Sequence, residues 1–245
     1  MHPDHTESKC GPKTAVVTGG SGAIGRACGV ALRAQGYEVL LAARRVQPLE
    51  AAADEVGGRW ISGDCSNESD VDRIMEAAGE VDVLVHAAGM YEGGFVREQS
   101  VDVFDRIISS NLRSAYLLTR AVLPRMSAGA RIIYISSVTG LKGVKGMAAY
   151  SSSKAGLVAL AQSVAGEVER DGIGVHLVTP GPVRTDMTDP ETNPDSGVRQ
   201  WTLEPEDVAS AVAWLVQLPP RIVVRDIVMR SATTGPFAPK PIGAS

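Results

Sequence analysis

The chain alternates short, continuous apolar runs with longer amphipathic stretches, and this alternation constrains its fold more than any other feature. The apolar runs are Ala15–Thr18, Val39–Ala42, Trp60–Ser62, Val81–His86, Ile132–Ser136, Val175–Thr179 and Ile222–Met229. Each run predicts a strand that is buried on both faces, because a strand with one wet face would alternate apolar and polar residues. We therefore expect an α/β protein with about seven strands in one covered sheet.

The stretches between these runs carry apolar residues at helical spacing. They are Ile24–Gln35, Glu68–Ala78, Val103–Met126, Ala148–Asp171 and Pro205–Gln217. Gly36 and Gly172 directly follow two of them, at the position where many helices end. Strand–helix–strand alternation implies right-handed crossovers, and hence a mostly parallel sheet with helices on both faces.

Composition excludes several classes of protein. Lys and Arg number 24 and Asp and Glu number 28, so the net charge is −4, and no long basic run favours nucleic-acid binding. No stretch approaches the roughly 20 apolar residues of a membrane span. The segment Met1–Thr14 is polar and lacks the apolar centre of a secretion signal. Cys10, Cys28 and Cys65 cannot all pair and fit no zinc pattern, so we expect reduced thiols, no metal site and a cytoplasmic location.

The first strand runs directly into a glycine-rich turn that precedes a helix. The turn contains the predicted binding residues Gly19, Ser21, Gly22, Ala23, Ile24 and Gly25. Glycines let the backbone approach a pyrophosphate, and the start of a helix offers it free N–H groups and a positive dipole end. A plain structural loop would give the same pattern, but the place of the turn between strand and helix favours a dinucleotide site.

Two arginines follow the second strand, about 20 residues after the turn. An acidic residue there would bind a ribose 2′-hydroxyl and favour NAD(H), whereas Arg44 and Arg45 are suited to a 2′-phosphate. The alternative is a pair of solvated arginines at the start of a helix. We expect NADP(H) as the cofactor, with Arg44 as the stronger candidate.

Tyr150 and Lys154 lie four residues apart, on one face of a predicted helix. An ammonium beside a phenol favours the phenolate, so we expect Lys154 to lower the pKa of Tyr150 and to make it a general acid/base. Ser137, at the end of the preceding strand, lies 13 residues before Tyr150, and its hydroxyl could face Tyr150 across a pocket.

At this point the chain resembles the classical short-chain dehydrogenase/reductase family, from about Lys13 to about Met229. The matching pieces are Thr18–Gly25, Asp64, Ala87-Ala88-Gly89, Asn111, Ser137, Tyr150, Lys154 and Pro180–Thr185. The resemblance implies a single Rossmann-like, doubly wound domain over residues 13–245. We expect a flexible tail over 1–12, a substrate loop over 186–202 and a C-terminal tail over 231–245.

The resemblance also implies roles for these residues. Tyr150 would exchange the proton, Lys154 would hold the nicotinamide ribose, Ser137 would bind the substrate oxygen, and Asn111 would anchor a water behind Lys154. Asp64 would contact the adenine, and Val183 and Thr185 the nicotinamide half. The cofactor-binding set implied as a whole is Gly19, Ser21, Gly22, Ala23, Ile24, Gly25, Arg44, Arg45, Asp64, Cys65, Ala87, Ala88, Gly89, Tyr150, Lys154, Pro180, Gly181, Val183 and Thr185.

The chain departs from the family pattern at three places, one of which is Ala23 in place of a common glycine. His86-Ala87-Ala88-Gly89 replaces the usual Asn-Asn-Ala-Gly, and we expect His86 to be a satisfied buried histidine rather than a proton carrier. The C-terminus lacks the usual Asp-Gly-Gly ending. Its segment 222–230 resembles a subgroup that typically consists of NADP-dependent reductases.

We therefore expect an oxidoreductase acting on CH–OH donors, which interconverts a ketone or aldehyde and an alcohol, with no nucleic-acid or membrane partner. Met90, Tyr91, Val138, Thr139, Gly140 and Val144 are expected to line the substrate pocket. One alternative is a reductase of carrier-bound 3-oxoacyl chains, for which Arg113, Arg120, Arg125, Lys142 and Lys145 could form a docking patch. The other is a nucleotide-binding regulator without catalysis. Family likeness suggests a homo-oligomer, a tetramer or else a dimer.

Overall fold

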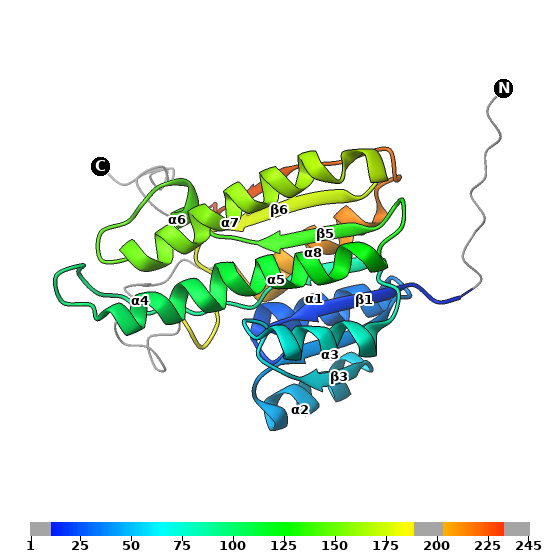
Figure 1. Ribbon diagram of the computed structural model, residues 1–245, viewed down its shortest axis with the longest axis horizontal. Helices are drawn as coiled ribbons and strands as arrows, with labels where there is room; N and C mark the ends of the chain where they lie inside the picture. The colour runs from blue at the N-terminus through cyan, green and yellow to red at the C-terminus, as the bar shows by residue number, and fades with distance from the viewer. Residues whose placement is uncertain (1–10, 189–202, 233–245) are drawn as a thin grey trace, which may run out of the picture.

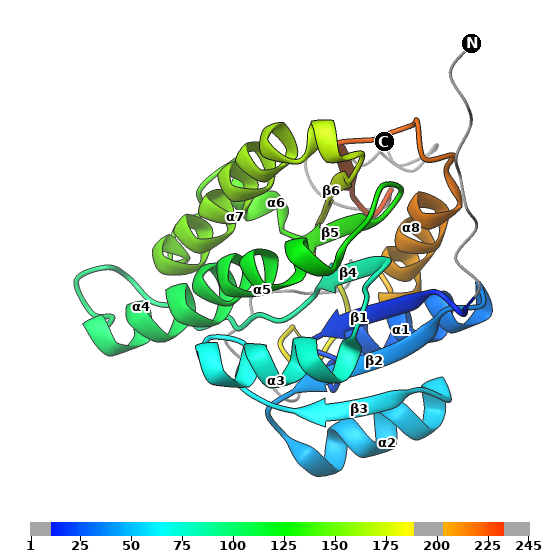
Figure 2. The ribbon, with the colours of Figure 1, turned by 45° about the vertical axis from the view of Figure 1, so that its right-hand side comes forward.

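Seven parallel strands form one sheet in the computed structural model, which describes residues 11–188 and 203–232. The strands are β1 (Thr14–Thr18), β2 (Glu38–Ala43), β3 (Arg59–Ser62), β4 (Val83–His86), β5 (Arg131–Ile135), β6 (Gly174–Pro180) and β7 (Asp226–Met229). Their order across the sheet is β3-β2-β1-β4-β5-β6-β7, and every neighbouring pair is parallel (Figures 1 and 2). The expected doubly wound fold is confirmed. Because the strands are parallel, all their carboxyl ends lie at one rim.

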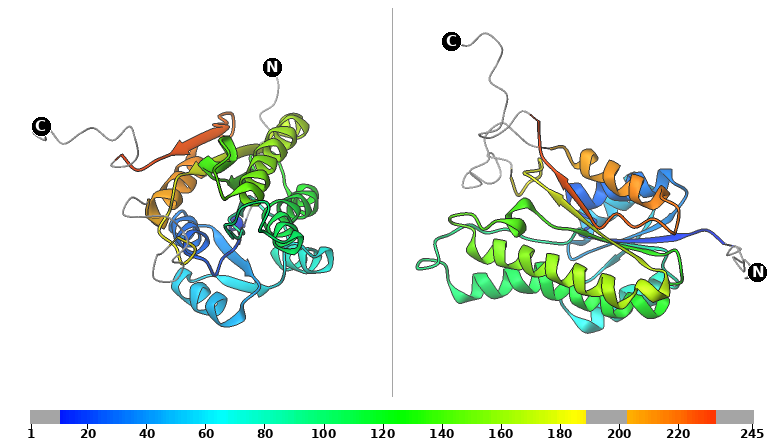
Figure 3. Two further views of the ribbon diagram at one scale, coloured as in Figure 1. Left: turned by 90° about the vertical axis from the view of Figure 1, so that its left-hand side faces the viewer. Right: turned by 90° about the horizontal axis from the view of Figure 1, so that it is seen from above.

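Helices cover both faces of this sheet (Figure 3). They are α1 (Ala23–Ala34), α2 (Val46–Val56), α3 (Glu68–Ala78), α4 (Val101–Ile108), α5 (Ser114–Val122), α6 (Val138–Leu141), α7 (Ala148–Glu167) and α8 (Pro205–Gln217). One face packs against α3, α5 and α7 and the other against α1, α2 and α8. Along β1, Val16 belongs to the first core while Ala15 and Val17 belong to the second, as the two-residue period of a strand requires.

Several helix ends follow from local sequence. The Asn67 side chain accepts hydrogen bonds from Ser69 N and Asp70 N at the start of α3. Glu204 and Asp207 form a reciprocal capping box around Pro205 at the start of α8. Gly57 ends α2 with a φ of +66°, in the left-handed region that glycine adopts freely.

The predicted helix over Val103–Met126 is not continuous. It begins at Val101 as α4, passes through a π-turn at Ser109–Arg113 (η1), continues as α5 and ends in a 3₁₀ turn at Leu123–Arg125 (η2). In the π-turn the Ser114 N–H donates to Ser109 O, five residues back, instead of to Ser110 O. The helix predicted over Ala148–Asp171 likewise ends at Glu167, followed by the 3₁₀ turn Glu169–Asp171 (η3). The structure also adds α2 and α6, which the sequence analysis did not predict.

The last strand is half as long as predicted, because Arg131 holds the chain before it away from the sheet. Arg131, at the start of β5, donates to Leu218 O at 2.5 Å and to Ile222 O at 3.4 Å. Its guanidinium also lies 3.0 Å from His176 Nε2. Pairing with β6 therefore begins near Arg225, whose carbonyl accepts from Leu177 N, and the predicted run Ile222–Met229 shortens to β7.

Within residues 11–188 and 203–232, no helix has both the length and the apolarity that crossing a bilayer requires. Residues 1–10, 189–202 and 233–245 lie outside the described part of the chain, and with them most of the predicted tails and substrate loop.

Candidate active site

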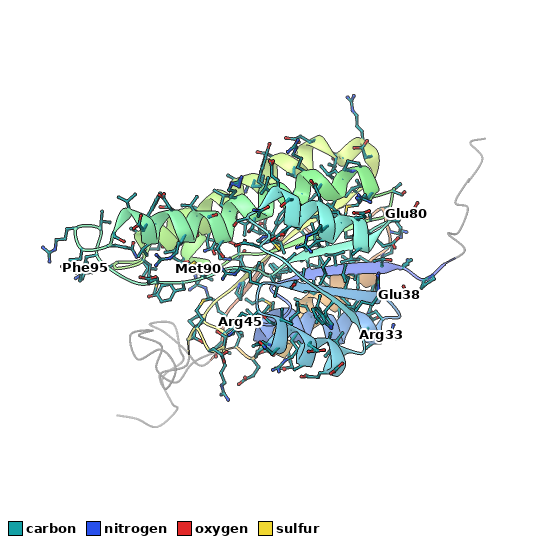
Figure 4. All side chains as sticks on the ribbon, turned by 60° about the horizontal axis from the view of Figure 1, so that its bottom comes forward. Arg33, Glu38, Arg45, Glu80, Met90 and Phe95 are labelled. Carbon is teal, nitrogen blue, oxygen red and sulfur yellow. The ribbon has the colours of Figure 1, made fainter. Side chains whose placement is uncertain are left out.

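A cavity of about 350 Å³ opens at the rim where the carboxyl ends of the strands meet. Figure 4 shows Arg45 and Met90 toward this rim, and Arg33, Glu38 and Glu80 at the opposite one. The cavity wall contains most of the predicted cofactor set. These residues are Gly19, Ser21, Gly22, Ala23, Ile24, Gly25, Arg44, Arg45, Asp64, Cys65, Ala87, Ala88, Gly89, Tyr150, Lys154 and Thr185.

Other predicted residues do not line the cavity. Val183 is buried in the core beneath it, and Gly181 N donates to Met229 O at the end of β6, directly after Pro180. Asn111 and Ser137 are not among the residues that line the cavity. Conversely, the wall includes residues that the sequence analysis missed, namely Ala43, Gly63, Ser110, Ser114, Ile135 and Ser136. Ser110 and Ser114 share one helix face at a spacing of four, but no motif in the sequence marked them as site residues.

The glycine-rich turn packs too closely for side chains. A Cβ at Gly25 would lie 2.3 Å from Gly19 O, and a Cβ at Gly19, where φ is +67°, would lie 2.8 Å from Ala87 C. Helix α1 begins directly after this turn, and Gly22 at its N-cap makes no side-chain cap. The first N–H groups of α1 are thus presented to the cavity, as a phosphate group requires.

The far end of the cavity carries charged groups from the turns after β2 and β3. Arg44 and Arg45 are exposed there. Asp64 Oδ1 accepts from Ser66 N at 2.9 Å and from Ser66 Oγ at 2.7 Å, which fixes the carboxylate in its turn. Burial, with the nearby charge of Asp64, raises the pKa of the Cys65 thiol to about 12, so this cysteine stays protonated.

Tyr150 and Lys154 project from the first turns of α7 at the other end. Lys154 is 5% exposed, and its Nζ lies 5.8 Å from the centre of the Tyr150 ring. The ammonium donates to Ile135 O at 3.0 Å, at the carboxyl end of β5. Ser137 follows that strand, caps α6 through Thr139 N, and hydrogen-bonds Tyr150. The predicted approach of a strand-end hydroxyl to a helix-borne tyrosine is therefore present.

The expected effect of Lys154 on Tyr150 is not found. Burial raises the pKa of Tyr150 to about 12, the hydrogen bond with Ser137 lowers it, and Tyr91 raises it; Lys154 does not contribute. Burial in turn lowers the pKa of Lys154 to about 8. The correction has a geometric reason, since the ammonium is directed at a backbone carbonyl. Tyr150 is thus a neutral phenol at pH 7, which is the form of a proton donor.

Asn111 lies in the π-turn and ties three elements together. Its Oδ1 accepts from Met90 N at 2.7 Å, and its Nδ2 donates to Met90 O at 3.0 Å and to Ser153 Oγ at 2.9 Å. Gly89 leaves the space beside it: a Cβ there would lie 3.3 Å from Asn111 Oδ1 and 3.5 Å from Lys154 Nζ. Asn111 and Lys154 thus flank one backbone position.

His86 is fully buried at the end of β4, and only half of its hydrogen-bonding capacity is used. Its Nε2 lies 3.1 Å from Ser114 Oγ, while Nδ1 has no partner among the described residues. Burial, aided by the charge of Lys154, lowers its pKa to about 3. The expectation that His86 is not a proton carrier agrees with this neutral state, but the expected full satisfaction of its ring is wrong.

Known proteins resemble this chain in sequence. The family model described as short chain dehydrogenase matches residues 13–196. An uncharacterized oxidoreductase of Staphylococcus epidermidis is 31% identical over 232 residues, which cover 91% of this chain and 99% of the relative. A 3-oxoacyl-[acyl-carrier-protein] reductase of Rickettsia felis is 33% identical over 213 residues, 83% of this chain and 88% of the relative.

Solved structures resemble the whole arrangement. The crystal structure of BdcA in complex with NADPH superposes with a TM-score of 0.82 at 28% identity and covers 90% of this chain and 93% of that one. A short chain dehydrogenase from Burkholderia cenocepacia in complex with NADP gives a TM-score of 0.80 at 28% identity, over 89% of this chain and 96% of that one.

Proposed function

Because the chain belongs to the short-chain dehydrogenase family, we propose that it is an NADP(H)-dependent oxidoreductase that interconverts a ketone or aldehyde and the corresponding alcohol. The observation that carries the proposal is a single cavity with the glycine-rich turn on its wall, Arg44 toward one end and the Tyr150–Lys154 pair toward the other.

The residues present fit NADP(H). The Gly19–Gly25 turn leaves the space that a pyrophosphate needs, and the start of α1 supplies its N–H donors. Arg44 offers a guanidinium for a 2′-phosphate at the exposed end of the cavity. Relatives of known structure bind NADPH or NADP, by the descriptions of their crystals. When bound, this cofactor supplies or accepts the hydride.

The protein itself handles the proton. In the direction of reduction, the neutral Tyr150 phenol donates its proton to the substrate oxygen, and Ser137 hydrogen-bonds the same oxygen as negative charge develops on it. Lys154 holds the ribose next to the reacting centre. Asn111 anchors a water behind Lys154, through which the phenolate recovers its proton. In oxidation the same residues act in the reverse order.

The experiment that tests this proposal is Tyr150→Phe. The variant keeps the ring and its packing but lacks the proton, so we expect NADPH to bind with unchanged affinity and turnover to fall by several orders of magnitude. Tyr116→Phe is the matched control, because Tyr116 is 56% exposed on α5, and it should leave turnover unchanged. Near-normal turnover in Tyr150→Phe would overturn the mechanism.

A reductase of carrier-bound 3-oxoacyl chains is the second candidate, favoured by the likeness to the Rickettsia felis enzyme. Lys142 and Lys145 are exposed in the loop before α7, and Lys145 lies over the ring of Phe95, 5.5 Å from its centre. A carrier could dock on such cations. Comparing kcat/KM for one 3-oxoacyl group on its carrier and as a free thioester separates the two candidates, since only a carrier enzyme gains from the protein.

We also propose a cytoplasmic homo-oligomer, a tetramer or else a dimer, that pairs through α4, α5 and α7. Phe104 on α4 and Tyr116 on α5 are large apolar side chains exposed on this surface. Light scattering after gel filtration gives the mass directly, and a monomer would contradict the proposal.

A further inference from the structure

We propose that His86 is a positioning residue: through Ser114 it holds the π-turn in the register that presents Asn111 to the active site. The inference rests on the proposed function, because it concerns how Asn111 serves the Tyr150–Lys154 pair. It extends that function to a side chain that lies outside the cavity wall.

The first step concerns a backbone carbonyl that the π-turn frees. In an α-helix the Ser114 N–H would donate to Ser110 O, four residues back. Here it donates to Ser109 O, although Ile108 and Ser114 on either side keep ordinary helical dihedral angles. Ser110 O, which is only partly buried, therefore loses its usual backbone partner and is left to find another donor.

The second step is that the Ser114 side chain replaces this partner. Ser114 Oγ donates to Ser110 O at 2.5 Å. A hydroxyl has one proton, so Ser114 Oγ can only accept from His86 Nε2, which lies 3.1 Å away. This assigns the ring proton to Nε2. The result is a directed chain of hydrogen bonds from His86 through Ser114 to Ser110 O.

The bond between His86 and Ser114 is buried, which makes it hard to replace with water. His86 is fully buried and Ser114 is 1% exposed. If the imidazole were absent, Ser114 Oγ would lose its donor, and the carbonyl cap would be held by the hydroxyl alone. The α-helical bond from Ser114 N to Ser110 O would then compete with the π-turn.

A return to the α-helical register would displace Asn111. One residue corresponds to about 100° of rotation about a helix axis. Asn111 could not then bind Met90 and Ser153 together, as it does in the π-turn. His86 and Met90 both belong to the segment at the end of β4, so this segment holds the π-turn at two points, through Ser114 and through Asn111.

The test compares His86→Leu, which has similar bulk but no donor, with His86→Gln, which restores an N–H group. We expect His86→Leu and Ser114→Ala each to lower kcat about tenfold or more, with the Kd of NADPH within about twofold of wild type. His86→Gln should recover most of the kcat. The double variant His86→Leu/Ser114→Ala should be no worse than the poorer single variant, because both act through one chain of bonds.

Two controls separate positioning from folding and from the proposed reaction. His176→Gln replaces another buried histidine, at the opposite rim, and should leave the kcat of the folded enzyme unchanged. Backbone hydrogen exchange over residues 109–114 should be at least tenfold faster in His86→Leu than in wild type. This exchange measurement holds even if the wild-type enzyme turns over none of the substrates tried.

The proposal is overturned if His86→Leu keeps both the wild-type kcat and the wild-type exchange over 109–114. It is also overturned if Gln at position 86 performs no better than Leu, or if the effects of His86→Leu and Ser114→Ala on kcat multiply. If His86→Leu does not fold, the proposal is tested by kcat and by hydrogen exchange over 109–114 in Ser114→Ala and His86→Gln.

Discussion

The ring of Tyr91 stands nearly perpendicular to the ring of Tyr150, at 83°, with the two centres 5.3 Å apart. The loop that carries Tyr91 is fixed to the start of α7, because Gly94 N donates to Gly146 O at 2.9 Å. Edge-to-face contact of this kind stabilises both rings. Tyr91 is therefore a wall beside the proposed proton donor, at the place where the sequence predicted part of the substrate pocket.

This contact predicts a change in the pH profile. The phenol of Tyr91 is one of the groups that raise the pKa of Tyr150, because two neighbouring phenolates would repel each other. Tyr91→Phe keeps the ring and removes the ionisable hydroxyl, so the apparent pKa of Tyr150 in the pH dependence of kcat/KM should fall. Tyr116→Phe, on the exposed face of α5, should leave the profile in place; an upward movement in Tyr91→Phe would contradict the assignment.

Cofactor preference should depend on Arg44. Arg44→Asp replaces a guanidinium suited to a 2′-phosphate with a carboxylate that can accept a ribose hydroxyl. We expect the ratio of kcat/KM for NADPH over NADH to fall about tenfold or more. Arg45→Asp makes the same charge change one residue further on and should shift the ratio less. An unchanged ratio in Arg44→Asp would show that Arg44 does not bind the phosphate.

Replacing glycine with alanine should harm the protein at Gly25, in the glycine-rich turn, and stabilise it at Gly166, outside that turn. Gly25→Ala places a Cβ 2.3 Å from Gly19 O, so the turn must open and the affinity for NADPH should fall strongly. Gly166→Ala, near the end of α7, meets nothing within 4 Å and should raise the free energy of unfolding by about 1 kcal/mol. Titration with NADPH and urea unfolding measure the two effects. If Gly25→Ala still binds NADPH tightly, the glycine-rich turn does not bind the pyrophosphate as proposed.

Acid should destabilise the fold through its buried histidines. Burial lowers the pKa of His176 from 6.5 to about 4 and that of His86 to about 3. Above pH 6.5 both imidazoles are neutral in the folded protein and in the unfolded chain. Below it only the unfolded chain takes up protons, so the free energy of unfolding should fall as the pH drops toward 4, by about 3 kcal/mol for His176.

Urea unfolding between pH 4 and pH 7 measures this loss. His176→Gln removes one of the two groups while its amide can still bond Val224 O and Arg131, so its stability should depend less steeply on pH. If the free energy of unfolding depends equally steeply on pH in wild type and in His176→Gln, His176 does not contribute to the loss of stability in acid.

The strands could be predicted to within about two residues, with the exception of β7, because a buried parallel strand reads as a continuous apolar run. Helix α2 was missed, although Val46, Leu49, Ala53 and Val56 recur at helical spacing. The position that obscures it is Pro48, which lies in the first turn of α2, where proline is tolerated.

The π-turn had no local signal. It depends on Ser114 Oγ and on His86, which lies 28 residues earlier in the chain. The short β7 has a similar origin, since Arg131 binds carbonyls 87 and 91 residues away. The spacing of Tyr150 and Lys154 correctly placed both on one helix face. It could not reveal that Lys154 is directed at Ile135 O, and that burial therefore controls the pKa of Tyr150.

Arg131 and Ser137 lie at opposite rims of the sheet, with the length of β5 between them. The Arg131 guanidinium bonds His176 and the carbonyls of Leu218, Pro219 and Ile222, none of which lines the cavity. Changes of substrate selectivity at the cavity rim therefore leave in place the hydrogen bonds by which Arg131 anchors the chain before β7.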